Sequence, residues 1–183
     1  MIRDLPSPEL LRKLLRYEPD TGKLFWRHRT PDMFNDGYRK AEGNCANWNS
    51  KWAGKEALNY VMNDGYKFGG VLGVKYLAHR IIFTMYYGEQ PKHQIDHIDG
   101  NRKNNKISNL RDVPPIENSK NQAKRKSNTS GHCGVKWQKN CWVASIGAKG
   151  KKVHLGCFQN INDAIDAREK ANIKYGYSDR HGS

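Results

Sequence analysis

The sequence predicts an α+β fold, in which short antiparallel strands and short helices form two parts. Turn residues divide residues 57–78 into about three strands, and residues 79–87 follow with the pattern of a buried helix. A strand, a polar loop, a second strand and a helix fit residues 93–123. Three alternating segments and an alanine-rich helix fit residues 134–175, which indicates a second, smaller domain.

The composition restricts the class of protein and of partner. The 183 residues suffice for one medium domain or two small ones, and 32 Lys and Arg against 18 Asp and Glu give a formal net charge of +14. Such an excess favours a polyanion, most often nucleic acid. Mean hydropathy is −0.91, and the sequence contains neither a membrane span of about 20 apolar residues nor the apolar core of a signal peptide. The four cysteines form no CxxC pair, so we expect free thiols in a cytoplasmic protein.

The first helix and strand carry clear local signals. Ser7-Pro8-Glu9 begins a helix, with serine as the N-cap, proline at the first position and an acid in the first turn. The one-sided leucine stripe that follows predicts a helix that ends near Tyr17. Leu24-Phe25-Trp26 starts a strand.

Residues 29–55 are harder to interpret. They contain several glycines and asparagines and no clear period, which favours an irregular loop that orders on nucleic acid. Two tryptophans in this segment, Trp48 and Trp52, either cover the core or stack on bases.

The stretch from residue 93 to residue 121 carries the candidate chemistry. Its first strand covers Gln94–Ile98, and Asp99-Gly100-Asn101 is a strong turn signal. Leu110 and Val113 bracket the second strand. Two prolines end that strand, and the helix should run from about Pro115 to Ala123.

Two oxygen donors and one histidine in this stretch suit metal-assisted hydrolysis of a phosphate ester. Asp96 offers a carboxylate oxygen and Asn118 an amide oxygen, which leave most of a Mg²⁺ shell to water and phosphate. His97, neutral near pH 7, can take a proton from an attacking water. A zinc site formed by His79, His93 and His97 is the alternative, but these histidines have no recognised spacing.

The same stretch resembles the HNH nuclease motif, or ββα-metal finger, of phage and homing endonucleases. Asp96-His97 matches the Asp-His of the first strand, Asn109 the middle asparagine and Asn118 the last position. The resemblance implies that Asp96 and Asn118 hold Mg²⁺, with Mn²⁺ as a substitute, and that His97 is the general base. It implies a structural role for Asn109. An inactive finger that keeps only the fold is the competing interpretation.

Several basic residues near the finger are candidate phosphate contacts. Ala-His-Arg at residues 78–80 also resembles this nuclease subgroup, so His79 and Arg80 either approach a phosphate or, for His79, lie buried and hydrogen-bonded. Arg102 belongs to the basic loop of the finger. Lys124 and Arg125 lie in a polar linker that can bind phosphate nonspecifically.

The C-terminal module has its own alternation. Strands are predicted near residues 135–138, 142–146 and 152–156, and a helix capped by Asn160 follows over about residues 161–175. The alternation assigns one face to the helix, namely Val135, Trp137, Trp142, Ala144, Ile146, Val153 and Leu155. It assigns the other face to solvent, namely Lys136, Gln138, Val143, Ser145, Lys152 and His154.

This module resembles the ethylene-response-factor (Apetala-like) type of DNA-binding domain. The matching residues are Gly134-Val135, Trp142–Ile146, Leu155–Phe158 and the alanine-rich helix. The resemblance implies DNA contacts from Lys136, Gln138, Lys152 and His154. The face has fewer arginines than the plant pattern, and His154 replaces the usual aromatic, so a target sequence does not transfer. A small domain that binds protein or only stabilises the fold is the alternative.

Together these patterns predict a nuclease domain over residues 1–123, with the finger at about 93–123, a basic linker over 124–130 and a DNA-binding domain over 131–178. The resemblances imply a homing-type endonuclease that cuts double-stranded DNA and leaves 5′-phosphate and 3′-hydroxyl ends. One finger per chain favours a monomer that nicks, whereas a dimer would cut both strands. The alternatives are a noncatalytic DNA-binding regulator that retains the nuclease fold, and an RNA-binding protein or nonspecific nuclease. If a phage encodes the chain, its compartment is the host cytoplasm.

Overall fold

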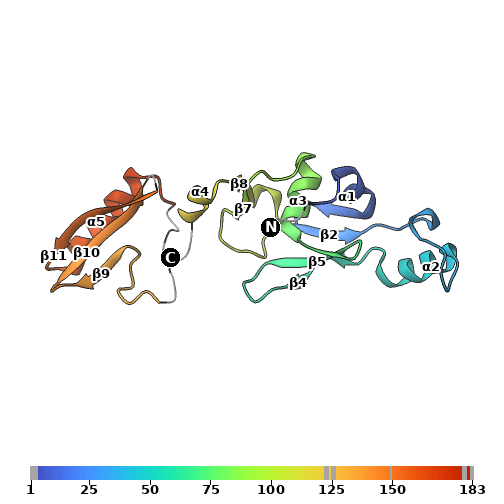
Figure 1. The fold of residues 1–183 in the computed structure, drawn as a ribbon, viewed down its shortest axis with the longest axis horizontal. Coiled ribbons are helices and arrows are strands. Elements are labelled where there is room, and N and C mark those ends of the chain that lie inside the picture. Colours follow the sequence, from blue (N-terminus) through green and yellow to red (C-terminus); the bar gives the residue numbers. More distant parts are fainter. Residues whose placement is uncertain (1–3, 122–123, 125–126, 149, 179–180, 182–183) are drawn as a thin grey trace. The chain divides into compact units, whose positions relative to one another are not determined.

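The computed structural model has a mixed α+β fold with several small antiparallel sheets (Figure 1). It describes residues 4–121, 124, 127–148, 150–178 and 181, without the side chain of Ile116. The chain divides into two compact units, Met1–Asp112 and Val113–Ser183. Among the described residues, no helix combines the length and the apolar character that crossing a membrane requires.

The first unit begins with a short helix and a hairpin. Helix α1 spans Pro8–Leu14, and the Ser7 hydroxyl accepts a hydrogen bond from the amide of Leu10 at 3.2 Å, as the capping signal predicts. The prediction that this helix reaches Tyr17 is wrong, because strand β1 (Leu15–Glu18) starts directly after it. Leu15 pairs with Trp26 of strand β2 (Lys23–Trp26), so the leucine stripe continues into a sheet.

The interpretation of residues 29–55 as an irregular loop is also wrong. A 3₁₀ turn, η1, spans Pro31–Met33, and a twelve-residue helix, α2, spans Ala41–Trp52. The Asp36 carboxylate accepts the amide of Ala41 at 2.8 Å and thereby satisfies a donor at the start of α2. Trp48 packs edge-on against Trp26, with the ring centroids 5.6 Å apart. This tertiary contact stabilises a helix whose polar sequence shows no clear helical pattern.

The rest of the first unit follows the predicted order. Strand β3 (Glu56–Ala57) adds to β2, and strands β4 (Tyr60–Val61), β5 (Lys67–Val71) and β6 (Val74–Leu77) form a meander. Helix α3 (Ala78–Tyr87) then ends at Gly88, which has the left-handed φ of 76° that glycine adopts most readily. Its apolar side chains complete the main core, which includes Leu11, Leu15, Leu24, Val71, Ile81 and Ile82.

The finger lies where predicted, with a shorter helix. Strand β7 spans Gln94–His97, a 3₁₀ turn (η2) spans Ile107–Asn109, and strand β8 spans Leu110–Val113. Helix α4 covers only Pro115–Ser119. The last two residues of the expected helix, at positions 122 and 123, lie outside the described residues.

The second unit contains the predicted sheet and helix. Strands β9 (Val135–Gln138), β10 (Cys141–Ala148) and β11 (Lys151–Phe158) form an antiparallel sheet, and helix α5 (Ile161–Lys174) packs along it (Figure 1). The small Ala144 and Ala164 are fully buried between the sheet and the helix.

Two residues of this sheet lie on their predicted faces but differ in exposure from a regular alternation. Trp137 lies on the edge strand β9 opposite Trp142, where it is 54% exposed and packs edgewise against Trp142, with the ring centroids 5.2 Å apart. Ser145 lies on the same surface as Lys136 and His154, as predicted, but it is buried. The register shifts beside it, because Ala144 pairs with Gly156 and Ser145 pairs with His154, which is a β-bulge.

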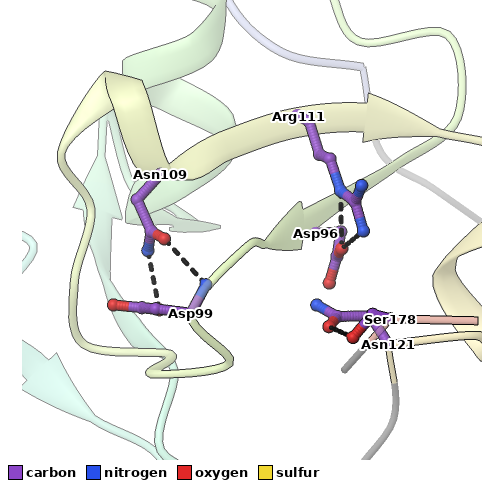
Figure 2. A network of polar contacts seen from close by, with 6 residues as sticks. All are labelled: Asp96, Asp99, Asn109, Arg111, Asn121 and Ser178. Atoms are coloured by element: carbon purple, nitrogen blue, oxygen red, sulfur yellow. Dashed lines mark hydrogen bonds and ion pairs between the residues drawn. The ribbon is translucent and has the colours of Figure 1, made fainter. Parts of the chain in front are cut away.

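The segment after α5 returns to the segment after α4. The Ser178 hydroxyl donates to the Asn121 side-chain oxygen at 2.9 Å (Figure 2). The Ser178 amide donates to the carbonyl of Lys120 at 3.3 Å. These contacts tie both ends of the second unit together.

Candidate active site

The Asp-His pair lies on β7 with both side chains buried. Asp96 is 8% and His97 is 2% exposed. The Nε2 atom of His97 lies 3.0 Å from the side-chain oxygen of Asn105. Because an amide oxygen only accepts hydrogen bonds, Nε2 carries the proton and Nδ1 holds the lone pair. The contact therefore selects the tautomer in which Nδ1 is the basic nitrogen.

Arg111 is a partner of Asp96 that the sequence analysis did not predict. Its Nε and Nη2 atoms both donate to Oδ2 of Asp96, at 2.9 and 2.7 Å (Figure 2). Arg111 lies on β8, the neighbour of β7 in the two-stranded sheet. The charge-assisted pair holds the Asp96 side chain in one orientation. The only sequence signal for this contact is an arginine two residues after the motif asparagine.

Asn109 hydrogen-bonds across the loop of the finger. Its side-chain oxygen accepts a hydrogen bond from the amide of Asp99 at 2.9 Å, and its NH₂ group donates to the Asp99 carboxylate at 2.9 Å (Figure 2). The NH₂ group also donates to the carbonyl of Asn104 at 2.8 Å. Although burial works in the other direction, the hydrogen bonds from Asn104 and Asn109 lower the pKa of Asp99. The loop after β7 thus closes on itself through one asparagine.

Two further rings pack against His97. His79 of α3 meets the ring of His97 edge-on with centroids 5.2 Å apart, and Tyr66 lies 5.1 Å from His79 and 5.8 Å from His97. Burial lowers the pKa of His97, and it lowers the pKa of His79 to about 3. Both imidazoles are therefore neutral at pH 7.

Of the three predicted arginine contacts, Arg102 lies at this cluster. Its guanidinium stacks 4.7 Å above the Tyr66 ring, and Nη1 donates to the carbonyl of Asp64 at 2.7 Å. Arg80 follows His79 on α3, is partly exposed, and has its pKa lowered by burial. Through its contact with Tyr66, Arg102 thus lies beside the rings that pack against His97.

The first hairpin supports the loop that carries Asn105. The Tyr17 hydroxyl donates to the carbonyl of Asn105 at 3.0 Å and accepts the amide of Ile107 at 2.9 Å. Burial raises the pKa of Tyr17 to about 12, so the hydroxyl keeps its proton. Gly22 comes so close that a Cβ there would lie 2.6 Å from the amide nitrogen of Lys106. Two residues far from the motif therefore position the partner of His97.

The donors present suit a hard divalent ion better than zinc. Among the described residues, no group of three or more His, Cys, Asp or Glu side chains could hold a metal ion, so the suggested zinc site of three histidines is not formed. Mg²⁺ needs only one or two protein carboxylates, since water and phosphate complete its shell. Asp96 supplies one carboxylate in the first unit, and Asn118 lies on α4 of the second unit.

The C-terminal sheet gathers the predicted DNA-contacting side chains on one concave surface. Lys136 and Gln138 from β9 and Lys152 and His154 from β11 line it, together with Val143 and Ser145 of β10. This surface, here called the sheet groove, has a volume of about 370 Å³ and further includes Lys139, Cys141 and Cys157.

Two phosphate contacts, Lys124 and Arg125, are predicted in the linker. Lys124 donates to the carbonyl of Gly131 at 3.0 Å, so it hydrogen-bonds to its own chain. Arg125 lies outside the described residues. The four cysteines are free, as expected.

Comparison with known proteins bears on the central segment. Residues 76–120 match the model of the HNH endonuclease family, a segment that includes Asp96, His97, Asn109 and Asn118. These residues form an HNH endonuclease domain, in the middle of the chain. The match includes α3, β7, β8 and α4, and with them the Asp-His pair and His79, whereas Tyr66 lies outside it.

A phage protein is also similar. Protein 3.8 of Escherichia phage T7 is 47% identical over 68 residues, which cover 36% of this chain and 56% of that protein. The chain thus spans little more than half the length of this relative. No solved structure matches the chain. The comparisons support an HNH nuclease and a phage connection, and they give no support for the resemblance of the C-terminal module to the ethylene-response-factor type.

Proposed function

We propose that the chain is a metal-dependent DNA endonuclease of the homing type, which hydrolyses a phosphodiester bond at a preferred site in double-stranded DNA. The observation that carries the proposal is the buried Asp96-His97 pair inside a segment that matches the HNH endonuclease family. The products would be a 5′-phosphate and a 3′-hydroxyl. With one finger per chain, a monomer would nick one strand per binding event.

His97 is the proposed general base. Its Nε2 proton is committed to Asn105, so Nδ1 is the nitrogen that would accept a proton from the attacking water. Its lowered pKa keeps the imidazole unprotonated and ready to accept that proton at pH 7. A neutral His79 beside it adds no competing charge.

Asp96 and Asn118 are the proposed ligands of Mg²⁺, with Mn²⁺ as a substitute. When bound, the ion would stabilise negative charge on the phosphate and on the departing oxygen. The support is the chemistry of the oxygen donors and the presence of both residues in the matched segment. Arg111, which binds Oδ2 of Asp96, would hold this carboxylate in place.

The sheet groove is the proposed DNA-reading surface, of the ethylene-response-factor type. A three-stranded sheet with a basic, polar face can enter the major groove, and Lys136, Gln138, Lys152 and His154 share one concave surface here. Arg80, Arg102, Lys124 and Arg125 would add phosphate contacts nearer the finger.

Cleavage of supercoiled plasmid tests the function. The purified chain is incubated with plasmids that carry different inserts, in Mg²⁺, in Mn²⁺ and in EDTA. Nicked circles that form only with a divalent metal, on some inserts far more than on others, are the expected result. Ligation of the nick without prior phosphorylation checks the end chemistry.

The same experiment distinguishes the proposed endonuclease from a noncatalytic DNA-binding regulator. A noncatalytic DNA-binding protein would retard the plasmid on a gel without converting it, in every metal and with every insert. Conversion of all inserts at equal rates would instead indicate a nonspecific nuclease.

A further inference from the structure

The first unit contains a second candidate binding site, well separated in sequence from the finger motif. A pocket of about 580 Å³ opens between α2, the strands β2 and β3, and the β4–β5 hairpin. This volume lies within the range of about 300–1,000 Å³ that small-ligand sites occupy. It is here called the tryptophan pocket, and its defining side chains are Trp26, Arg29, Trp48, Trp52, Lys55 and Tyr60.

Aromatic rings dominate the walls of this pocket, and two of them remain open to solvent. Trp52 is 36% exposed and Tyr60 is 65% exposed, which is far more than packing against a core requires. Trp48 is held by Trp26 on one side, and the Arg29 guanidinium lies 3.8 Å from its ring centroid. The walls thus offer flat apolar surfaces with a cation already stacked among them.

The charges at the pocket suit an anion. Lys55 is exposed and Arg29 is partly exposed. The Nε atom of Arg29 is buried and has no hydrogen-bond partner, an unfavourable environment for a cation that negative charge nearby would relieve. The acid among the lining residues, Glu56, is already paired with Lys67 at 3.1 Å and with Lys23 at 3.9 Å. A ligand would therefore meet positive charge and aromatic surface together.

Bare backbone forms another part of the pocket. Gly70 and Gly73 line it, and a Cβ added at either would meet nothing within 4 Å. Gly70 has an ordinary φ, so a larger residue there is not strained by the backbone. Glycines with empty space above them let a planar ligand approach the main chain closely.

We propose that the tryptophan pocket binds an unpaired nucleobase of single-stranded DNA, with Arg29 and Lys55 against the adjoining phosphates. A duplex hides the faces of its bases in the stack, whereas an unpaired base can lie on exposed aromatic rings. The choice of DNA rests on the proposed function, and the site itself lies outside the finger and the sheet groove. It would hold a strand that is separated near the cut.

Binding of two matched probes to the full chain tests this proposal. One is a fluorescein-labelled thymidine strand of about 12 nucleotides, and the other is an abasic strand with the same number of phosphates. Fluorescence anisotropy is measured in EDTA, so that neither probe is cut. The chain should bind the thymidine strand about tenfold more tightly than the abasic one, since a base stacked on aromatic side chains contributes roughly this gain in affinity. Thymidine can serve as the probe because such stacking is sequence-tolerant.

A substitution that fills the pocket should abolish this preference. Gly70→Leu places a side chain in the empty space and should bring the thymidine strand to the affinity of the abasic strand. Gly37→Leu is the matched control, because a Cβ at Gly37 also meets nothing within 4 Å and this glycine does not line the pocket. The control should bind both probes as the wild type does.

A second pair of variants guards against misfolding. Should Gly70→Leu lose the near-ultraviolet circular dichroism of the wild type, Trp52→Ala replaces it, with the fully exposed Tyr38→Ala as the control. Equal binding of the two probes by the wild type overturns the proposal. So does a preference for the thymidine strand that survives the pocket variant.

Plasmid nicking by the same wild-type preparation separates the two claims. Nicking without a preference for bases would contradict the proposed base-binding pocket and support the proposed endonuclease. A preference for bases without nicking in any metal would support the pocket and contradict the endonuclease.

Discussion

Two buried histidines, His79 of α3 and His97 of the finger, meet edge-on, and their hydrogen bonding differs. His97 has a hydrogen-bond partner for Nε2 in Asn105. His79, at 4% exposed, has a buried Nδ1 atom without a hydrogen-bond partner. A protonated His79 would place a charge in a ring cluster with Tyr66 and the neighbouring His97, so the folded state favours the neutral form.

The titration of His79 predicts how stability depends on pH. The pKa of about 3 in the folded chain lies below the ordinary value of 6.5, so between these values the unfolded chain binds a proton that the folded chain does not. Stability is therefore fully present above pH 6.5 and falls as the pH drops towards 3. From about pH 7.5 to about pH 5 this one group should cost about 2 kcal/mol.

Urea unfolding of the wild type and of His79→Phe over this range measures the effect. The variant should lose less stability on acidification than the wild type, by about the amount attributed to His79. Parallel curves for the two proteins would mean that His79 carries its proton in the folded chain.

The residues of the motif were visible in the sequence, but their partners were not. Asp96, His97, Asn109 and Asn118 stand at a recognisable spacing. Arg111 contacts Asp96 because β8 lies beside β7, and Asn105 contacts His97 because of the conformation of the loop, and no local pattern encodes either contact. Sequence reasoning thus located the candidate chemistry and missed what orients it.

At the scale of elements, the β1–β2 hairpin acts as a support for the finger. Its turn brings Gly22 against the backbone of Asn105 and Lys106. The Tyr17 hydroxyl hydrogen-bonds to the carbonyl of Asn105 and to the amide of Ile107 in the same segment. Gly22 has a φ of 69°, which glycine adopts without strain. Only a residue without a Cβ allows this close approach.

Alanine substitution at two glycines separates the close approach from the backbone strain. Gly22→Ala and Gly54→Ala both force alanine into a left-handed conformation, at a φ of 69° and 76°. A Cβ at Gly54 meets nothing within 4 Å, whereas one at Gly22 meets the Lys106 nitrogen at 2.6 Å. Gly54→Ala should cost about 1 kcal/mol of stability.

Gly22→Ala should cost clearly more than this control and should also slow plasmid nicking, because Asn105 must move. Thermal unfolding and single-turnover nicking of both variants provide the measurements. Equal losses of stability with unchanged nicking in both would show that the hairpin does not support the site.

The elements that sequence reasoning found and missed follow a physical pattern. The hairpins of residues 60–77 and 135–158 have strong turns and alternating strands, and both were predicted. Helix α2 was missed because it has only Cys45 buried and depends on Trp48 packing against Trp26. The sequence predicts a longer helix α1 than the structure has, because a run of leucines suits both a helix and the strand that follows.

At the scale of the whole molecule, positive charge is the dominant feature. A net charge of +14 should bind a DNA backbone by releasing counterions, so affinity should fall steeply with salt. The sheet groove concentrates three lysines, Lys136, Lys139 and Lys152, on one surface of the second unit. It should therefore account for part of that salt dependence.

Replacing two of these lysines measures that part. Lys136→Ala combined with Lys152→Ala should weaken duplex binding and lower the slope of log K against log salt by about 2, since each phosphate contact contributes nearly one. Lys170→Ala combined with Lys174→Ala on α5 is the control with the same loss of charge. If the slope of log K against log salt were the same for both double variants, the sheet groove would make no specific contribution to DNA binding.

The central claim is that His97 is the base of a DNA endonuclease, and single-turnover nicking of supercoiled plasmid in Mg²⁺ tests it most directly. The wild type is compared with His97→Ala and with His93→Ala, whose side chain is 46% exposed four residues earlier. We predict that His97→Ala loses at least about 100-fold in rate, the usual contribution of a general base, while its DNA binding and fold are retained. His93→Ala should cut as the wild type does. Cleavage by His97→Ala at the wild-type rate would contradict the assignment and place the catalytic centre elsewhere.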